Sequence, residues 1–199
     1  MMVIMSPVST RKELSHARIV EVAAKAIRRA GYRGIGVADI MKEAGLTHGG
    51  FYAHFDSRES MLVEAMQRAG QENLSALCEG MERLLRKGET RFSALVHTYL
   101  HEAHLERVDG GCVVAALASE MTRQSDAVRA EACRRVEALM ALVQASLPEP
   151  ADAGQAQQVT AAMVGALQLA RTLGAQAGRE LLAHTRQALI ERHEPKARR

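Results

Sequence analysis

The sequence contains no tryptophan and only three tyrosines and three phenylalanines among 199 residues. Its three cysteines, Cys78, Cys112 and Cys133, are odd in number and far apart, so we expect neither a disulfide framework nor a zinc site. No apolar run approaches the roughly 20 residues that a membrane-spanning helix needs. The first ten residues also lack the basic segment of a signal peptide. These absences predict a cytoplasmic protein that has no membrane partner.

The motifs of common enzyme classes are missing as well. The sequence has no legible Ser-His-Asp order, P-loop or pair of catalytic carboxylates, so we predict no catalytic residue and no cofactor. His97, His101 and His104 are spaced to share one face of a helix. Because no carboxylate pattern accompanies them, we expect them to line a pocket or the surface and predict no metal site.

What the sequence does contain is typical of helices. Apolar residues make up 47% and charged residues 25%, with many alanines and leucines and only four prolines. Strand-like alternation and repeats are absent, which predicts an all-α fold of about nine helices. Residues 1–70 carry ten basic and seven acidic side chains, whereas residues 71–199 carry sixteen of each. The whole positive excess therefore lies in the first third, which indicates an anionic partner there.

The first helix is predicted to end at Gly31, after an apolar stripe that runs from Ile19 to Ala30. Its start is open between Thr10, which can form a capping box with Glu13, and Ser15. A second, short helix covers 37–44 and is followed by a glycine and one leucine. Two helices joined by so tight a turn cross steeply, as in a helix-turn-helix.

The third helix, about 47–54, combines two aromatic anchors with two adjacent glycines. Phe51 and Phe55 are four residues apart, so they share one face and can hold this short helix on the first two. On the opposite side Gly49 and Gly50 let the backbone approach a surface closely, as entry into a DNA groove requires. The neighbouring hydroxyls and imidazoles suit phosphate oxygens and base edges: Thr47, His48, Tyr52 and His54.

A fourth helix, about 57–86, begins at Asp56 or Ser57 and ties this unit rigidly to the rest of the chain. Arg58 at its start is expected to point back towards the DNA-contacting face. We therefore predict a three-helix DNA-binding domain over residues 1–56 and a helical effector-binding and dimerisation domain over residues 57–199.

The last two helices, about 155–175 and 179–193, carry an alanine-rich stripe and a leucine stripe. Small residues allow another helix to approach closely, so we predict that these helices form a homodimer seam, packing within one chain being the alternative. The residues assigned to the seam are Ala162, Met163, Ala166, Leu181, Leu182 and Leu189.

An effector site is expected among the middle helices, where methionine and small apolar residues leave adaptable space. Cys112 follows two glycines and begins a helix, a position that can activate a thiol, so a thiol- or electrophile-responsive switch is one alternative and a buried gap-filling residue is the other. The residues assigned to this site are Leu62, Met66, Val96, Tyr99, Leu100, Cys112, Ala116 and Met140.

The stretch "GYRGIGVADIMKEAGLTHGGFYAHFDSRESM", residues 31–61, closely resembles the TetR (tetracycline-repressor-like) family of transcriptional regulators. The resemblance implies an Ω-shaped, all-helical homodimer that binds a palindromic DNA operator and releases it when a small molecule binds. Thr47, His48, Tyr52, His54 and Arg58 match DNA-contacting positions of the family. Gly36 stands where the family often has threonine, which leaves that phosphate contact to backbone N–H groups.

The segment "GGCVVAALASE", residues 110–120, is similar to one branch of the same family, but it does not identify an effector. A DNA-binding protein indifferent to sequence is the remaining alternative. It would bind all DNA alike with a steep dependence on salt.

Overall fold

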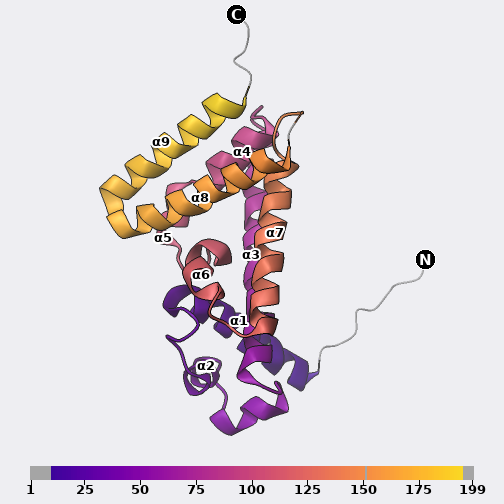
Figure 1. Cartoon of the computed structure of the whole chain (residues 1–199). Helices are drawn as coiled ribbons and strands as arrows, with labels where there is room; N and C mark the ends of the chain where they lie inside the picture. Colours follow the sequence, from indigo (N-terminus) through magenta and orange to yellow (C-terminus); the bar gives the residue numbers. More distant parts are fainter. Residues whose placement is uncertain (1–9, 151, 195–199) are drawn as a thin grey trace, which may run out of the picture.

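The structure is a computed structural model that describes residues 10–150 and 152–194. Over these residues the chain forms nine α-helices and one 3₁₀ helix, and no strand (Figure 1). The ends of the two predicted domains, 1–9 and 195–199, lie outside the described residues, as does the segment in which a signal peptide was sought. No described helix is long and apolar enough to cross a membrane. The predicted all-α fold is confirmed.

The DNA-binding unit predicted from the sequence consists of α1 (Arg11–Ala30), α2 (Val37–Glu43) and the 3₁₀ helix η1 (His48–Ala53). The N-terminus of α1 is a capping box: the Glu13 amide donates to Thr10 Oγ1 at 3.2 Å, and the Thr10 amide donates to Glu13 Oε2 at 2.7 Å. Thr10, rather than Ser15, therefore begins α1. Gly31 ends it with φ at +75°, a conformation that favours glycine.

The third element is a 3₁₀ helix, not the α-helix that its spacing suggested. The Gly50 amide donates to the Thr47 carbonyl at 3.0 Å and the His54 amide to the Phe51 carbonyl at 2.9 Å, both with the i→i+3 spacing. Two adjacent glycines in so short a segment lower the propensity for α-helix, and Thr47 makes no side-chain cap. Burial of Phe51 and Phe55 holds the segment in place, with ring centroids 5.4 Å apart.

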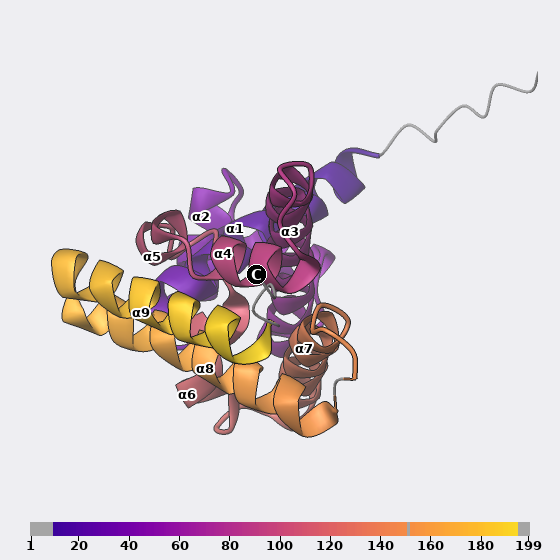
Figure 2. The same cartoon turned by 90° about the horizontal axis from the view of Figure 1, so that it is seen from above.

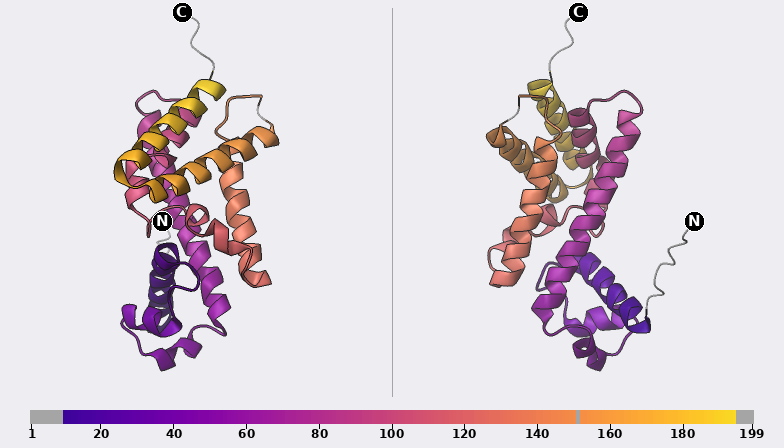
Figure 3. Two further views of the ribbon diagram at one scale, coloured as in Figure 1. Left: turned by 60° about the vertical axis from the view of Figure 1, so that its left-hand side comes forward. Right: turned by 90° about the vertical axis from the view of Figure 1, so that its right-hand side faces the viewer.

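Two long helices, α3 (Arg58–Leu85) and α7 (Asp126–Gln144), pack side by side through the body of the molecule. Ser57 caps α3, its Oγ accepting from the Ser60 amide at 3.1 Å. This helix starts in the DNA-binding unit and then runs beside α7 (Figures 1 and 3). One buried apolar cluster extends from α1 along α3 into the C-terminal helices, so the core is continuous across the boundary predicted at residues 56 and 57.

At the far end from η1, the helices α8 (Ala153–Leu173) and α9 (Ala175–His193) pack against each other as an antiparallel pair. Seen from above, the pair lies to one side of α3 and α7, and α9 also covers α4 (Figure 2). The Gly174 hinge between them has φ at +84°. This arrangement leaves one side of the pair open to solvent.

Three short helices connect α3 to α7: α4 (Arg91–Tyr99), α5 (Glu102–Glu106) and α6 (Val113–Met121). The predicted continuous helix through the three histidines is wrong, because the chain turns at Leu100 and His101 caps the new helix α5, its Nδ1 accepting from the Ala103 amide at 3.1 Å. The histidines therefore do not share one helical face. No group of three His, Cys, Asp or Glu side chains with metal-ligand geometry occurs within 10–150 and 152–194.

His104 joins these short helices through two backbone hydrogen bonds. Its Nδ1 donates to the Tyr99 carbonyl at 2.7 Å, and its Nε2 accepts from the Cys112 amide at 2.8 Å. Only the neutral imidazole can donate at one nitrogen and accept at the other. Burial, with smaller contributions from Arg171 and Arg107, lowers the pKa of His104 to about 4.

Truncating the aromatic anchor of η1 is expected to destabilise the fold. We expect Phe51→Ala to lower the free energy of unfolding by about 3–5 kcal/mol, because it empties a buried ring site. Tyr52→Ala is the matched control: the Tyr52 side chain is 76% exposed, so the loss should stay within about 0.5 kcal/mol. Chemical denaturation followed by circular dichroism measures both values. Equal losses in the two variants would contradict the anchor role of Phe51.

His104 should make stability depend on pH. Because its pKa is lower in the folded chain than in the unfolded one, the unfolded chain takes up the proton first, and stability falls as the pH drops from about 6.5 to about 4. Replacement by glutamine removes this dependence, so the stability gap between the native protein and His104→Gln should narrow by roughly 2–3 kcal/mol between pH 7.5 and pH 4.

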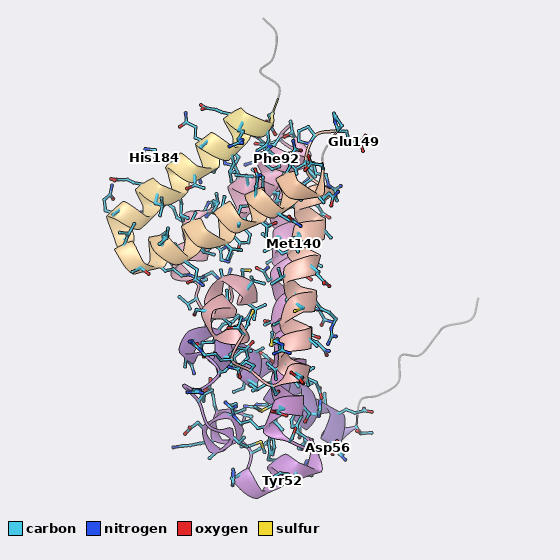
Figure 4. All side chains as sticks on the ribbon, in the orientation of Figure 1. Tyr52, Asp56, Phe92, Met140, Glu149 and His184 are labelled. Atoms are coloured by element: carbon cyan, nitrogen blue, oxygen red, sulfur yellow. The ribbon has the colours of Figure 1, made fainter. Side chains whose placement is uncertain are left out.

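Denaturation curves across this pH range test the expectation, with His184→Gln as the control. His184 is exposed on α9 (Figure 4), so its replacement should leave the pH profile of the native protein unchanged. A gap between the native protein and His104→Gln that stays constant with pH would mean that His104 does not stay neutral in the folded chain.

Candidate nucleic-acid interface and ligand cavity

The predicted DNA-contacting residues cluster on η1 and its flanks, at the end of the molecule away from α8 and α9. Figure 4 shows the Tyr52 side chain projecting at this end. A β-carbon at Gly49 would meet nothing within 4 Å, so the backbone there is open to a close approach. The predicted residues that are exposed are Gly36, Thr47, His48, Gly49 and Tyr52, and Gly50 is half-buried.

Two of the predicted contacts, Arg58 and His54, are half-buried. The Arg58 guanidinium donates a hydrogen bond to the Tyr32 carbonyl, so Arg58 points towards the loop that follows α1. The His54 ring lies 6.0 Å from the His16 ring, and burial, followed by the nearby His16, lowers the pKa of His54. Their partial burial places both behind the exposed surface of η1.

The N–H of Gly36 is also occupied, because it donates to the Asp39 carboxylate at 3.2 Å. A phosphate contact at the N-terminus of α2 would thus have to use the following amides rather than that of Gly36.

Several exposed cations around this unit were not singled out from the sequence. Lys12, Arg18, Arg33 and Lys42 have no ion pair with any residue in the described part of the chain. Arg18 lies next to the turn after α2, where a β-carbon on Gly45 would be 3.6 Å from its guanidinium. The charge excess of residues 1–70 was the signal that pointed to them.

A buried joint fixes this unit to the C-terminal helices. Tyr32 is fully buried: its amide donates to Glu120 Oε2 of α6 at 3.1 Å, and its hydroxyl donates to the Met66 sulfur of α3 at 2.9 Å. Its carbonyl accepts the bond from Arg58. The loop that follows α1 is therefore held by two helices. No local sequence pattern around Tyr32 predicts these contacts, because their partners lie far away along the chain.

Arg28 makes the second tie of the joint. Its side chain is buried, forms an ion pair with Glu72 of α3 at 2.7 Å, and donates to the Gly111 carbonyl at 3.4 Å. Arg68 binds the same carboxylate at 2.7 Å, and the two guanidinium groups together hold the pKa of Glu72 below its usual range despite its burial. The α5–α6 loop thus contacts the C-terminal half of α1.

A half-open cavity of about 630 Å³ lies between α3, α4, α5 and the α5–α6 loop. Gly80 lets α3 and α4 cross closely, because a β-carbon there would overlap the Thr98 side chain. The cavity is lined by Asn73, Ala76, Leu77, Gly80, Arg83, Leu84, Arg86, Lys87, His97, Thr98, His101, Ala103, His104, Arg107, Gly110 and Gly111.

None of the eight residues predicted for the effector site lines this cavity. Leu62, Met66, Val96, Tyr99 and Leu100 are buried in the solid core, while Ala116 and Met140 are half-buried elsewhere. Leu62 and Met66 lie in the first third of α3, and the cavity opens about two to five turns beyond Met66, from Asn73 to Leu84. Of the predicted histidines, all three lie at the cavity wall.

Cys112 is buried and lines only a small second cavity of about 70 Å³. Burial and the adjacent Cys112 raise the pKa of the Tyr99 hydroxyl beside it. This placement favours the interpretation of Cys112 as a buried, gap-filling residue over that of a solvent-accessible sensor.

The residues predicted for the dimer seam lie mostly inside the chain. Met163, Ala166, Leu182 and Leu189 are buried, and Ala162 and Leu181 are half-buried. They pack α8 and α9 against each other and against the core. Packing within one chain is the alternative to a dimer seam that the sequence analysis left open. A second stripe of α8 faces solvent instead, with Leu169 59% exposed and Leu173 57% exposed.

Comparison with known proteins supplies the family. Residues 19–65 match the model of bacterial regulatory proteins of the tetR family, and residues 88–189 match that of the tetracyclin repressor-like C-terminal domain. The HTH-type transcriptional repressor DhaR of Mycobacterium sp. (strain GP1) is 27% identical over 124 residues, which are 60% of this chain and 58% of that protein. The chain thus matches less than two thirds of the length of this curated relative.

Solved structures share the fold over nearly the whole chain. The reduced form of E. coli NemR has a TM-score of 0.74 at 19% identity and covers 92% of this chain and 99% of its own. A TetR regulator from Chloroflexus aurantiacus J-10-FL has a TM-score of 0.74 at 24% identity, with 92% and 97% covered. With both family models matched along the chain and an exposed helix-turn-helix at its end, the protein belongs to the TetR family of transcriptional regulators.

Proposed function

We propose that this regulator is a repressor that binds a palindromic operator as a homodimer and leaves it when a small molecule fills the cavity between α3, α4 and α5. The observation that carries the proposal is the exposed face of η1, on which Thr47, His48 and Tyr52 project beside an open glycine backbone. Phe51 and Phe55 hold that face rigidly from behind. A rigid, short helix with a bare backbone suits entry into the major groove.

The joint made by Tyr32 and Arg28 supports the release step. Glu120 and Gly111, its partners in the C-terminal helices, lie on α6 and on the loop before it, and that loop lines the cavity. A ligand that shifts this loop therefore acts on α1 through direct hydrogen bonds, and α1 carries η1. Coupling between the two sites requires such a physical connection.

The solvent-facing stripe of α8 supports the homodimer. Leu169 and Leu173 lie one turn apart, and Gly165 precedes them by one turn with no atom within 4 Å of a β-carbon placed there. Two copies of this stripe can pack closely across a two-fold axis. A dimer would place two η1 helices on one DNA duplex, as a palindromic operator demands.

Two variants on η1 should separate affinity from specificity. The operator is first isolated by selection from random double-stranded DNA with the purified protein. Tyr52→Phe should then weaken binding to operator and random DNA alike, by about 1 kcal/mol for one lost phosphate hydrogen bond. His48→Ala should instead weaken operator binding by roughly 1–3 kcal/mol and leave random DNA nearly unaffected.

Both side chains are exposed, so both variants should keep the native melting temperature, and fluorescence anisotropy with labelled duplexes measures the affinities. A selection that enriches no sequence would show binding indifferent to sequence and overturn the proposed function. If Tyr52→Phe lowers stability while DNA binding stays intact, the Tyr52 hydroxyl is structural and not a phosphate contact.

Charge on the open stripe of α8 should separate the subunits. We expect Leu169→Arg to give monomers in multi-angle light scattering, because the two-fold axis would bring the new cations together. Leu85→Arg, at an exposed leucine at the end of α3, is the control and should remain dimeric. Ala166 is buried, so an arginine there would test folding rather than assembly. A dimeric Leu169→Arg protein would exclude this stripe from the interface.

A further inference from the structure

The cavity between α3, α4 and α5 is lined by charged residues of one sign, which is positive. Four of its lining residues are cationic, namely Arg83, Arg86, Lys87 and Arg107, and no lining residue is acidic. Arg83 lies in the last turn of α3, Arg86 and Lys87 follow the end of that helix, and Arg107 lines the cavity from the end of α5. Like charges brought to one cavity repel each other, and a bound anion relieves that repulsion.

These four cations are not neutralised from within the protein. No ion pair and no side-chain hydrogen bond joins any of them to a carboxylate of residues 10–150 or 152–194. Some arginines elsewhere are paired: Arg134 and Arg135 share Glu131, and Arg179 lies between Glu102 and Glu106. The remaining residues, 1–9, 151 and 195–199, contain no Asp or Glu.

The other lining residues indicate the chemistry of the rest of a bound ligand. Ala76, Leu77 and Leu84 give the α3 side of the cavity an apolar wall, and Asn73 and Thr98 add uncharged hydrogen-bonding groups. The volume of about 630 Å³ lies within the range of small-molecule sites. A ligand that fits this lining combines an anionic group with an apolar body.

Of the four cations, Arg107 adjoins the joint with α1. A β-carbon at Gly110 would be 3.3 Å from the Arg107 guanidinium, so Arg107 lies against this glycine. The next residue, Gly111, accepts the hydrogen bond from Arg28 of α1 and has no room for a side chain, because a β-carbon would be 2.9 Å from both His104 and Arg171. An anion held by Arg107 would thus pull on a loop that is packed directly against the DNA-binding unit.

We propose that this cavity binds an amphipathic organic anion, a carboxylate or a phosphate monoester with an apolar body, whose charged group sits among Arg83, Arg86, Lys87 and Arg107. The anion is the effector of the repressor, and this part of the inference rests on the proposed function. The anion site itself rests only on the charge and lining of the cavity.

Isothermal titration calorimetry of the full chain with four compounds of one tail length tests the charge. The compounds are octanoate, octyl phosphate, octanol and octylamine. At least one of the two anions should bind at least tenfold more tightly than octanol and octylamine, and its affinity should fall as salt rises. The stronger of the two anions identifies the head group as carboxylate or phosphate. Equal affinities for anion and alcohol, or no binding of either anion at millimolar concentration, would overturn the proposal.

Single replacements locate the site. Arg107→Gln and Arg83→Gln should each weaken the better anion by at least threefold and leave octanol unchanged. Arg129→Gln, an exposed arginine on α7, is the matched control and should bind the anion as the native protein does. Equal weakening in all three variants would mean a non-specific charge effect and would remove the site from this cavity.

Operator binding in the presence of the better anion tests its role separately. We expect saturating anion to weaken operator binding by at least fivefold in the native protein and by less in Arg107→Gln. If calorimetry shows the anion site but operator affinity stays constant, the anion binds in the cavity but is not the effector. If the protein selects no operator at all, the proposed function fails while the calorimetric result still decides on the anion site.

Discussion

The structure depends on how the segment after α1 is held between α3 and α6. Tyr32 is fully buried and uses all its polar groups there, with Glu120, Arg58 and Met66 as partners. A buried amide or hydroxyl without a partner costs free energy, so this position is favoured only when all three partners are in place. Together with the contacts of Arg28, those of Tyr32 set the orientation of the helix-turn-helix relative to the cavity.

Much of the fold could be predicted from the sequence because local signals were strong. The glycine at 31 and the aromatic pair Phe51 and Phe55 act over a few residues, and the structure has them as expected, apart from the 3₁₀ geometry of η1. The capping box at Thr10 is one of the two starts of α1 that the sequence left open. The break at Leu100 was missed, because an apolar stripe continues through it and the bonds that stabilise the turn come from His104 and Cys112, further along the chain.

The functional sites could be predicted only in part, for a related reason. Periodicity shows that a residue is on an apolar face, but it does not say what covers that face. Leu62 and Met66 were predicted to line a pocket, but their side chains are buried in the core. Ala166 was predicted to lie in a dimer seam, but its side chain is buried within the chain. The open stripe of Leu169 and the cationic wall of the cavity depend on tertiary contacts that only the structure supplies.

In the proposed release mechanism, the DNA-binding unit and the cavity loop are coupled through Arg28 and Tyr32. Coupling is reciprocal, so operator binding must affect the cavity loop even with no effector present. Hydrogen–deuterium exchange of the full chain with and without operator DNA measures this directly. We expect altered exchange in residues 107–121 as well as in 36–58, and altered exchange confined to 36–58 would contradict the coupling.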